Sequence, residues 1–144
     1  VTSSHCTTAA ALLNGIPPQA IRKVWGIAKI YETYVGAKDF QPHDSIFDAL
    51  QEIGEEFGAT TGRKRQCNWM DLKALMKAVK INGVTDLVFN KMDVLEEVGE
   101  WKIYNGDHLM EFNDQQHVKS WLTSYVNFSP GDINVYFSGN KDRI

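Results

Sequence analysis

The segment DLKALMKAVKINGVTDLVFNKMD, residues 71–93, decides the fold class of this chain. Its first part places apolar residues at positions i, i+3, i+4 and i+7, which predicts a helix from about Asp71 to Ile81 that Gly83 ends. The short apolar run 87–89 then predicts a buried strand. A helix followed by a buried strand indicates an α/β sheet, in which ligands bind beyond the carboxyl ends of the strands.

The flanking sequence predicts further helices and strands that extend this sheet. Helices are expected at 21–23, from Asp44 or Ser45 to Gly54, and after Asp114. Strands are expected at 24–35, 100–104 and 133–137, with a turn at Asn105-Gly106. No repeat or low-complexity segment marks a second domain. Residues 1–144 therefore form one α/β unit with mixed or parallel strands and flanking helices.

The composition is that of a globular protein and limits the classes of partner. With 144 residues and a formal net charge of −3, the chain has the length of one domain and lacks the basic surface of a general nucleic-acid or anionic-membrane binder. No apolar run approaches the roughly 20 residues that span a bilayer. Cys6 and Cys67 show no paired spacing, so we expect them to stay reduced in the cytoplasm.

Residues 90–93, Asn-Lys-Met-Asp, follow the predicted buried strand and form a candidate guanine-reading loop. The carboxylate of Asp93 can accept hydrogen bonds from N1–H and the exocyclic N2–H₂ of guanine, two donors that adenine does not present together. The stem of Lys91 can lie along the base. The pattern is only four residues long, so a polar loop without a ligand is the alternative.

Residues 58–65, GATTGRKR, combine two glycines, two threonines and three basic side chains. Gly58 and Gly62 allow a close approach of the backbone to a ligand, and Arg63 and Arg65 can each form a two-pronged pair with a carboxylate or phosphate. In an extended loop, these two arginines point the same way. The segment therefore predicts a loop for a small polyanion, and a solvated basic loop is the alternative.

The first residues suggest that the chain is part of a longer protein. It begins with Val1 rather than Met, and residues 1–15, VTSSHCTTAAALLNG, resemble neither a signal peptide nor a transit peptide. No Gly-rich phosphate loop of the Walker type and no HExxH motif occurs. The four histidines have no spacing typical of a metal site, so no metal ligands are expected in this chain.

The order of the motifs resembles the carboxyl-terminal part of the adenylosuccinate synthetase family. The landmarks are VTSS at 1–4 with TT at 7–8, YVG at 34–36, EFGATTGR at 56–63 with Arg65 and Trp69, NGVT at 82–85, and KMDVL at 91–95. The resemblance implies a fragment of a P-loop-like, GTP-dependent synthetase fold. It implies purine biosynthesis with GTP and Mg²⁺, in which IMP and L-aspartate are joined to give adenylosuccinate, GDP and phosphate.

The resemblance also implies roles for individual residues. IMP contacts are implied for Thr2, Val35 and Arg63. An aspartate loop over about 56–66 is implied, with contacts from Ala59, Thr60, Thr61, Gly62, Arg63, Lys64 and Arg65. GTP contacts are implied for Arg65, Asn90, Lys91, Asp93, Phe137, Ser138 and Gly139. The last three close over the guanine base at the end of a terminal helix-strand unit, 114–139.

The family's catalytic Asp and His, its phosphate loop and its Mg²⁺ ligands are expected upstream of Val1. The resemblance therefore implies no catalytic residue in this chain, which we expect to be inactive alone. The intact protein is expected to be a cytoplasmic homodimer that binds small molecules, with no nucleic-acid or membrane partner. Two alternatives remain: a phage-type relative that acts on a guanine deoxynucleotide to make a 2-aminoadenine precursor, and a guanine-nucleotide-binding module without catalysis.

Overall fold

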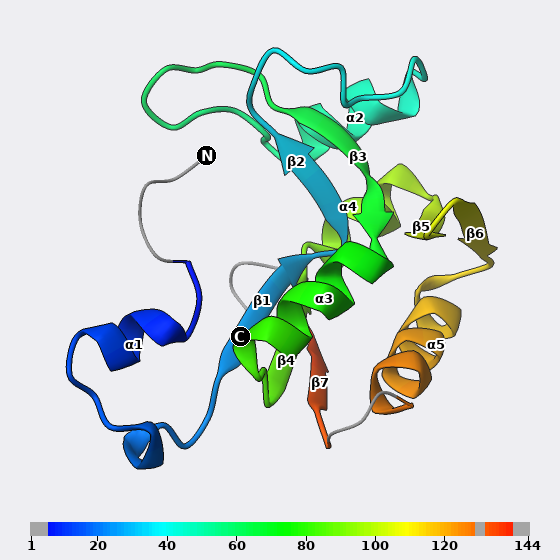
Figure 1. Cartoon of the computed structure of the whole chain (residues 1–144). Helices are drawn as coiled ribbons and strands as arrows, with labels where there is room; N and C mark the ends of the chain where they lie inside the picture. The colour runs from blue at the N-terminus through cyan, green and yellow to red at the C-terminus, as the bar shows by residue number, and fades with distance from the viewer. Residues whose placement is uncertain (1–5, 129–131, 140–144) are drawn as a thin grey trace.

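Two β-sheets organise the chain in the computed structural model, which describes residues 6–128 and 132–139 (Figure 1). Three parallel strands form the first sheet, in the order β1 (Trp25–Lys29), β4 (Asp86–Asn90) and β7 (Asn134–Phe137). The second sheet has the order β2 (Tyr31–Tyr34), β3 (Gln66–Asp71), β5 (Trp101–Asn105) and β6 (His108–Phe112). Only its β3–β5 pair is parallel, so the predicted α/β class with parallel and mixed sheets is confirmed.

Four helices pack beside these sheets, and two shorter ones precede β1. The longer helices are α2 (Ile46–Ile53), α3 (Leu72–Asn82), α4 (Met92–Val98) and α5 (Gln115–Asn127). The shorter ones are α1 (Ala9–Leu13) and the 3₁₀ turn η1 (Pro18–Ala20). None of the described helices has the length and apolar character that crossing a bilayer requires.

Local signals at both ends of α3 explain why its prediction is confirmed. The Asp71 side chain accepts hydrogen bonds from the amides of Lys73 and Ala74, which satisfies donors that a helix start leaves unpaired. Gly83 ends the helix with φ +59°, a conformation that glycine adopts without steric cost. Asp114 caps α5 in the same way by accepting from the amide of His117, so that helix is confirmed as well.

Helices α2 and α4 pack together in one part of the buried core, which also takes side chains from α3 and α5. Phe47 of α2 contacts Trp69 of β3 with 5.1 Å between ring centroids, and Leu50 and Leu95 are fully buried. Because α2 precedes the 56–66 loop and α4 begins within the 90–93 motif, this packing fixes the two candidate sites relative to each other.

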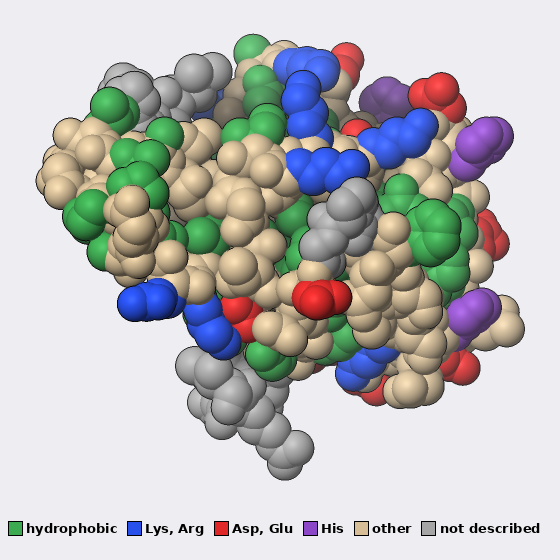
Figure 2. All heavy atoms as spheres, turned by 60° about the horizontal axis from the view of Figure 1, so that its bottom comes forward, with side chains coloured by type: hydrophobic (Ala, Val, Ile, Leu, Met, Phe, Trp, Pro, Cys, Tyr) green, Lys and Arg blue, Asp and Glu red, His purple; other side chains and the backbone are tan. Residues whose placement is uncertain are grey.

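One side of the parallel sheet leaves large apolar side chains exposed. Ile27 is 71% exposed, and the half-exposed ring of Trp25 stacks on Tyr136 at 5.4 Å. Parallel sheets are usually covered on both faces, so this side of the sheet is unusually open. On the face of the molecule in Figure 2, hydrophobic side chains gather in separate areas, with a group of Lys and Arg side chains between two of them.

The predicted single strand over 24–35 is wrong, because the chain changes sheets at Ile30. This residue is fully buried and its amide donates to the carbonyl of Asn90 at 3.0 Å. Residues before it pair with β4, and residues after it pair with β3. The apolar and aromatic residues that predicted one strand belong to two consecutive strands in different sheets.

The predicted helix over 21–23 is also wrong. Pro17 and Pro18 begin a helical turn as expected, but the turn ends at Ala20, and Ile21 is extended with ψ 110°. Four elements had no prediction: α1, β3, β6, and the helix α4. The hairpin of β5 and β6 closes through Asn105-Gly106, where the turn was predicted but not the returning strand. The strands near 87–89, 100–104 and 133–137 and the helix from 46 to 53 are confirmed.

Candidate functional site

The 90–93 motif joins the carboxyl end of β4 to the first turn of α4. Asn90 is the last residue of the strand, Lys91 takes a left-handed conformation with φ 63°, and Met92 begins the helix. The expectation that all four residues form a loop is therefore wrong. The physical reason is that Met92 and Leu95 lie three residues apart and are both buried, which makes 92–98 an amphipathic helix.

Asp93 lies beside the end of the last strand, in a pocket of about 410 Å³. Backbone hydrogen bonds hold this junction: the amide of Ser138 donates to Phe89, and the amide of Met92 donates to Ser138. A Cβ at Gly139 would lie 3.3 Å from the Cβ of Asp93, so the two residues are in close contact. The pocket is lined by Met92, Asp93, Glu96, Gln115, Lys119, Phe137, Ser138 and Gly139.

Helix α5 adds polar side chains to this pocket that the sequence reasoning missed. Lys119 donates to Gln115 at 2.6 Å, and Gln115 donates to Glu96 at 3.1 Å. The ammonium of Lys119 also lies 5.7 Å from the ring centroid of Phe137. Gln115 and Lys119 have the i, i+4 spacing of one helix face, which is the signal that could have found them.

Side chains around Asp86 fix the position of β7, and with it residues 137–139. Asp86 is buried, and its Oδ1 accepts hydrogen bonds from Asn134 at 3.0 Å and from the hydroxyl of Tyr136 at 3.3 Å. These contacts hold the first residues of β7 against the start of β4.

Neither Asn90 nor Lys91 lines the pocket that holds Asp93. The ammonium of Lys91 donates to the carbonyl of Gly54 at 3.0 Å, at the end of α2. The side-chain oxygen of Asn90 is buried and accepts no hydrogen bond within the described part of the chain. Buried acceptors are normally satisfied, so this oxygen is available to a donor from a ligand or water.

The 56–66 segment forms the loop between α2 and β3, which projects from the body of the molecule (Figure 1). Its base is closed by hydrogen bonds from the Gly58 amide to Arg63 and from the Arg65 amide to Glu56. Its tip turns at Gly62, with φ +62°. The amides of residues 59–61 donate no hydrogen bond to any described residue, so three neighbouring donors at the exposed tip remain free.

The three basic side chains of this loop do not converge on a common partner. Lys64 pairs with the exposed Glu52 at 3.2 Å, and Arg65 pairs with Glu56 at 2.9 Å. Arg63 is exposed and has no side-chain partner among the described residues. Only the tip of the loop turns: Lys64, between the two arginines, forms an antiparallel bridge with Phe57, so the chain at 63–65 is paired as in a strand. Their joint action on a ligand stays a prediction.

A buried carboxylate, Glu56, lies at the base of the loop and was not predicted as a site residue. It is 1% exposed, with Lys29 at 2.6 Å and the hydroxyl of Tyr31 at 2.7 Å from Oε1 and Arg65 at 2.9 Å from Oε2. Burial alone would raise its pKa, but the hydrogen bonds from Lys29, Tyr31 and Arg65 outweigh burial and hold the pKa below its usual value.

Cys67, directly after the loop, is a free thiol and is buried. Burial, followed by the negative charge of Glu56, raises the pKa of the Cys67 thiol to about 12. A thiol with so high a pKa is protonated and unreactive at neutral pH. No cluster of His, Cys, Asp or Glu that could hold a metal ion occurs in ranges 6–128 and 132–139.

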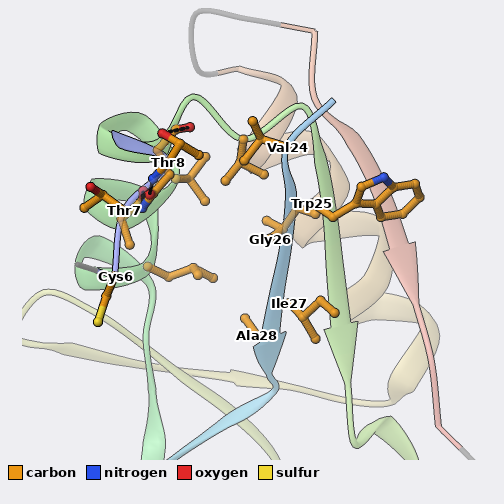
Figure 3. Close-up of a pocket in the computed structure, with 14 residues that line it drawn as sticks. Cys6, Thr7, Thr8, Val24, Trp25, Gly26, Ile27 and Ala28 are labelled. Atoms are coloured by element: carbon orange, nitrogen blue, oxygen red, sulfur yellow. Dashed lines mark hydrogen bonds between the residues drawn. The ribbon is translucent and has the colours of Figure 1, made fainter. Parts of the chain in front are cut away.

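The amino-terminal segment reaches a second pocket, of about 400 Å³, beside the edge of β1 (Figure 3). Thr8 is engaged by the end of α3: its amide donates to Asn82 Oδ1 and its hydroxyl to the Asn82 carbonyl. Trp25 and Ile27 point away from residues 6–8. Thr2 lies outside the described residues, and Val35 is exposed directly after β2, so the implied IMP contacts of both residues stay predictions.

Comparison with known proteins gives one consistent result. Residues 1–128 match the family model for adenylosuccinate synthetase. The adenylosuccinate synthetase of Yarrowia lipolytica is 41% identical over 124 residues, which cover 81% of this chain and 29% of that protein. The Chlorobaculum parvum synthetase is 39% identical over 146 residues, which cover 88% of this chain and 34% of that protein.

A solved structure supports the same relationship. The fully ligated adenylosuccinate synthetase of Plasmodium falciparum superposes with a TM-score of 0.66 and 30% sequence identity, over 79% of this chain and 29% of that chain. This chain therefore spans about a third of the length of the relatives it matches. On the extent of the family match and the identities of these relatives, the chain belongs to the adenylosuccinate synthetase family.

Proposed function

We propose that this chain supplies the guanine-binding and aspartate-binding part of a GTP-dependent ligase that converts IMP and L-aspartate to adenylosuccinate, GDP and phosphate. The observation that carries this proposal is the pocket that joins Asp93 to residues 137–139. The sequence assigned both segments to the guanine base, although they belong to different secondary-structure elements. Their contact in the folded chain supports that assignment.

Guanine recognition rests on the carboxylate of Asp93. This side chain is exposed at the mouth of the pocket, where it can accept hydrogen bonds from N1–H and N2–H₂ of the base. Phe137 and the backbone at Ser138 and Gly139 would cover the base, and Gly139 allows close approach because it has no Cβ. Lys91 of the same motif is tied to the end of α2 through the carbonyl of Gly54, and the buried oxygen of Asn90 has no donor among the described residues.

Aspartate binding rests on charge and directed donors in the 56–66 loop. L-aspartate carries two carboxylates and little apolar surface, so its affinity depends on N–H donors. The loop offers the free amides of residues 59–61 and the exposed guanidinium of Arg63. Arg65 adds a second guanidinium, whose side chain is 32% exposed.

The remaining expectations form part of the proposal. Thr2, Val35 and Arg63 would contact IMP, and Arg65 would also reach GTP. The family's reaction transfers the γ-phosphoryl group of GTP to the 6-oxygen of IMP, and the amine of aspartate then displaces it. We assign binding and orientation to this chain, and the catalytic groups and Mg²⁺ ligands to the rest of a longer, homodimeric, cytoplasmic enzyme whose carboxyl-terminal portion this chain represents.

The two alternatives receive less support. The Yarrowia lipolytica and Chlorobaculum parvum relatives are both named adenylosuccinate synthetase, which favours the biosynthetic ligase over a phage-type enzyme or a module without catalysis. No feature of the described residues favours either alternative.

A nucleotide titration tests the base-reading part of the proposal. GMP and AMP are added separately to the isotope-labelled chain, and the backbone amides of Asp93, Ser138 and Gly139 are followed by NMR. GMP is expected to shift these amides at millimolar concentration, whereas AMP shifts them at least about tenfold more weakly, a difference of about 1.4 kcal/mol. Equal responses to the two nucleotides would contradict the proposal.

A further inference from the structure

We propose that Glu56 is a positioning residue, which holds the Arg65 guanidinium in the orientation that pairs with a carboxylate of the dicarboxylate ligand. The inference rests on the proposed function of the 56–66 loop and assigns a role to a residue outside the predicted contacts. Glu56 lies too deep to touch the ligand, because it is only 1% exposed. It acts through Arg65.

The contacts around Glu56 are those of a rigid anchor. Its two carboxylate oxygens accept from three different segments: Lys29 at the end of β1, Tyr31 at the start of β2, and Arg65 near the end of the loop. Gly54 packs tightly beside them, since a Cβ there would lie 2.5 Å from the Tyr31 hydroxyl. A buried carboxylate held from three directions has little freedom to move, so the direction of its bond to Arg65 is fixed.

The contact with Arg65 leaves most of that guanidinium available. Glu56 uses one carboxylate oxygen and meets one terminal nitrogen, Nη1, at 2.9 Å. A guanidinium has five N–H donors in a fixed plane, so fixing one of them sets the orientation of the others. No other side chain in the described residues pairs with Arg65, so its remaining donors are free for a ligand carboxylate.

The backbone of Arg65 is held independently of the Glu56 side chain. Its amide donates to the carbonyl of Glu56 at 2.9 Å, and the Gln51 side chain donates to its carbonyl. Replacing the Glu56 carboxylate therefore changes the guanidinium while the base of the loop stays closed. This separation makes the inference testable.

Charge and positioning predict opposite results for the same substitution. Glu56→Gln removes a negative charge close to two cations, so a purely electrostatic role predicts tighter binding of an anion. Glutamine also supplies a single acceptor oxygen for three donors, and its amide N–H₂ group cannot pair with Arg65. A positioning role therefore predicts weaker binding despite the more positive site.

The test is an NMR titration of the labelled chain with L-aspartate, followed at the amides of residues 58–65, with GMP binding measured in the same samples. Glu52→Gln is the matched control, because Glu52 pairs with Lys64 of the same loop and loses the same charge but is 61% exposed. We expect Glu56→Gln to weaken aspartate binding by about tenfold or more and GMP binding by less than about twofold. Glu52→Gln is expected to leave both within about twofold.

The outcomes separate the inference from the proposed function. If the unsubstituted chain binds aspartate and Glu56→Gln binds it equally or more tightly, the positioning role is overturned while the function stands. If the unsubstituted chain shows no aspartate response in the loop, the proposed function of the loop fails as well. If circular dichroism shows that Glu56→Gln is unfolded, Tyr31→Phe is used instead, because it removes one hydrogen bond to the Glu56 carboxylate. This variant is expected to weaken aspartate binding about threefold, and unchanged binding would overturn the inference.

Discussion

Replacing Asp93 by asparagine should change which base the pocket prefers. The carboxylate of Asp93 accepts two donors from guanine, whereas an asparagine amide offers one acceptor and one donor direction. Xanthine has a carbonyl oxygen at position 2, where guanine has its amino group. We therefore expect Asp93→Asn to weaken the binding of GMP and to strengthen the binding of XMP.

The magnitude follows from the position of Asp93 in the structure. A hydrogen bond to a charged group contributes about 1.5–3 kcal/mol. Asp93 is exposed in the first turn of α4, so water competes for it and the lower end of that range applies. A loss of about 1.5 kcal/mol corresponds to roughly tenfold weaker GMP binding. With a gain for XMP, the GMP-to-XMP affinity ratio should fall by more than about tenfold.

The affinity ratio is measured by NMR titration of the chain with each mononucleotide. Any phosphate contact is common to GMP and XMP, so it cancels in the ratio and the base contact is isolated. Glu97→Gln is the control, because Glu97 lies on the same helix, is exposed and does not line the pocket. An unchanged ratio in Asp93→Asn, or an equal change in Glu97→Gln, would refute the reasoning.

Three further predictions concern the two sites and the buried carboxylate. Gly139→Ala places a Cβ 3.3 Å from Asp93, so GMP binding should weaken several-fold in the titration while the melting temperature stays close to the original; unchanged affinity would mean that the base does not pass this point. Arg65→Leu should weaken L-aspartate binding by about tenfold or more and Arg65→Lys nearly as much, because an ammonium lacks the planar two-pronged contact, whereas Arg22→Leu at an exposed position should have no effect. The pKa of Glu56 is held below its usual value of 4.5 in the folded chain, so its contribution to stability is present above about pH 4.5 and is lost as the pH falls through the folded value. The melting temperature should therefore fall more steeply with acidification in the original chain than in Glu56→Gln, and parallel curves would contradict this.

Elements whose signals are local were predictable from the sequence. Helix α3 has its own cap at Asp71 and its own glycine stop at Gly83, so its bounds needed no knowledge of distant residues. Asp93 and residues 137–139 were both assigned to a guanine site from motifs, and the fold places them in one pocket.

Features that depend on distant partners could not be predicted in the same way. The continuous strand character of 24–35 gave no sign that Ile30 passes from one sheet to the other, because that break depends on pairing with Asn90 and β3. Strand β3 was missed because Cys67 and Trp69 alternate over only a few residues. Glu56 looked like an ordinary acidic residue before a glycine-rich loop, and only the fold brings Lys29 and Tyr31 to it.

The most direct test of the proposed function is the activity of a chimaera in which this chain replaces the matching region of the Chlorobaculum parvum synthetase, to which it is 39% identical. The quantity measured is the rate of adenylosuccinate formation in the presence of GTP, IMP and L-aspartate. We predict that the chimaera forms adenylosuccinate, that omission of any one substrate abolishes the product, and that Asp93→Asn lowers the rate with GTP while raising the rate with XTP. A folded, dimeric chimaera that forms no adenylosuccinate would contradict the proposal that this chain binds the guanine nucleotide and aspartate of that reaction.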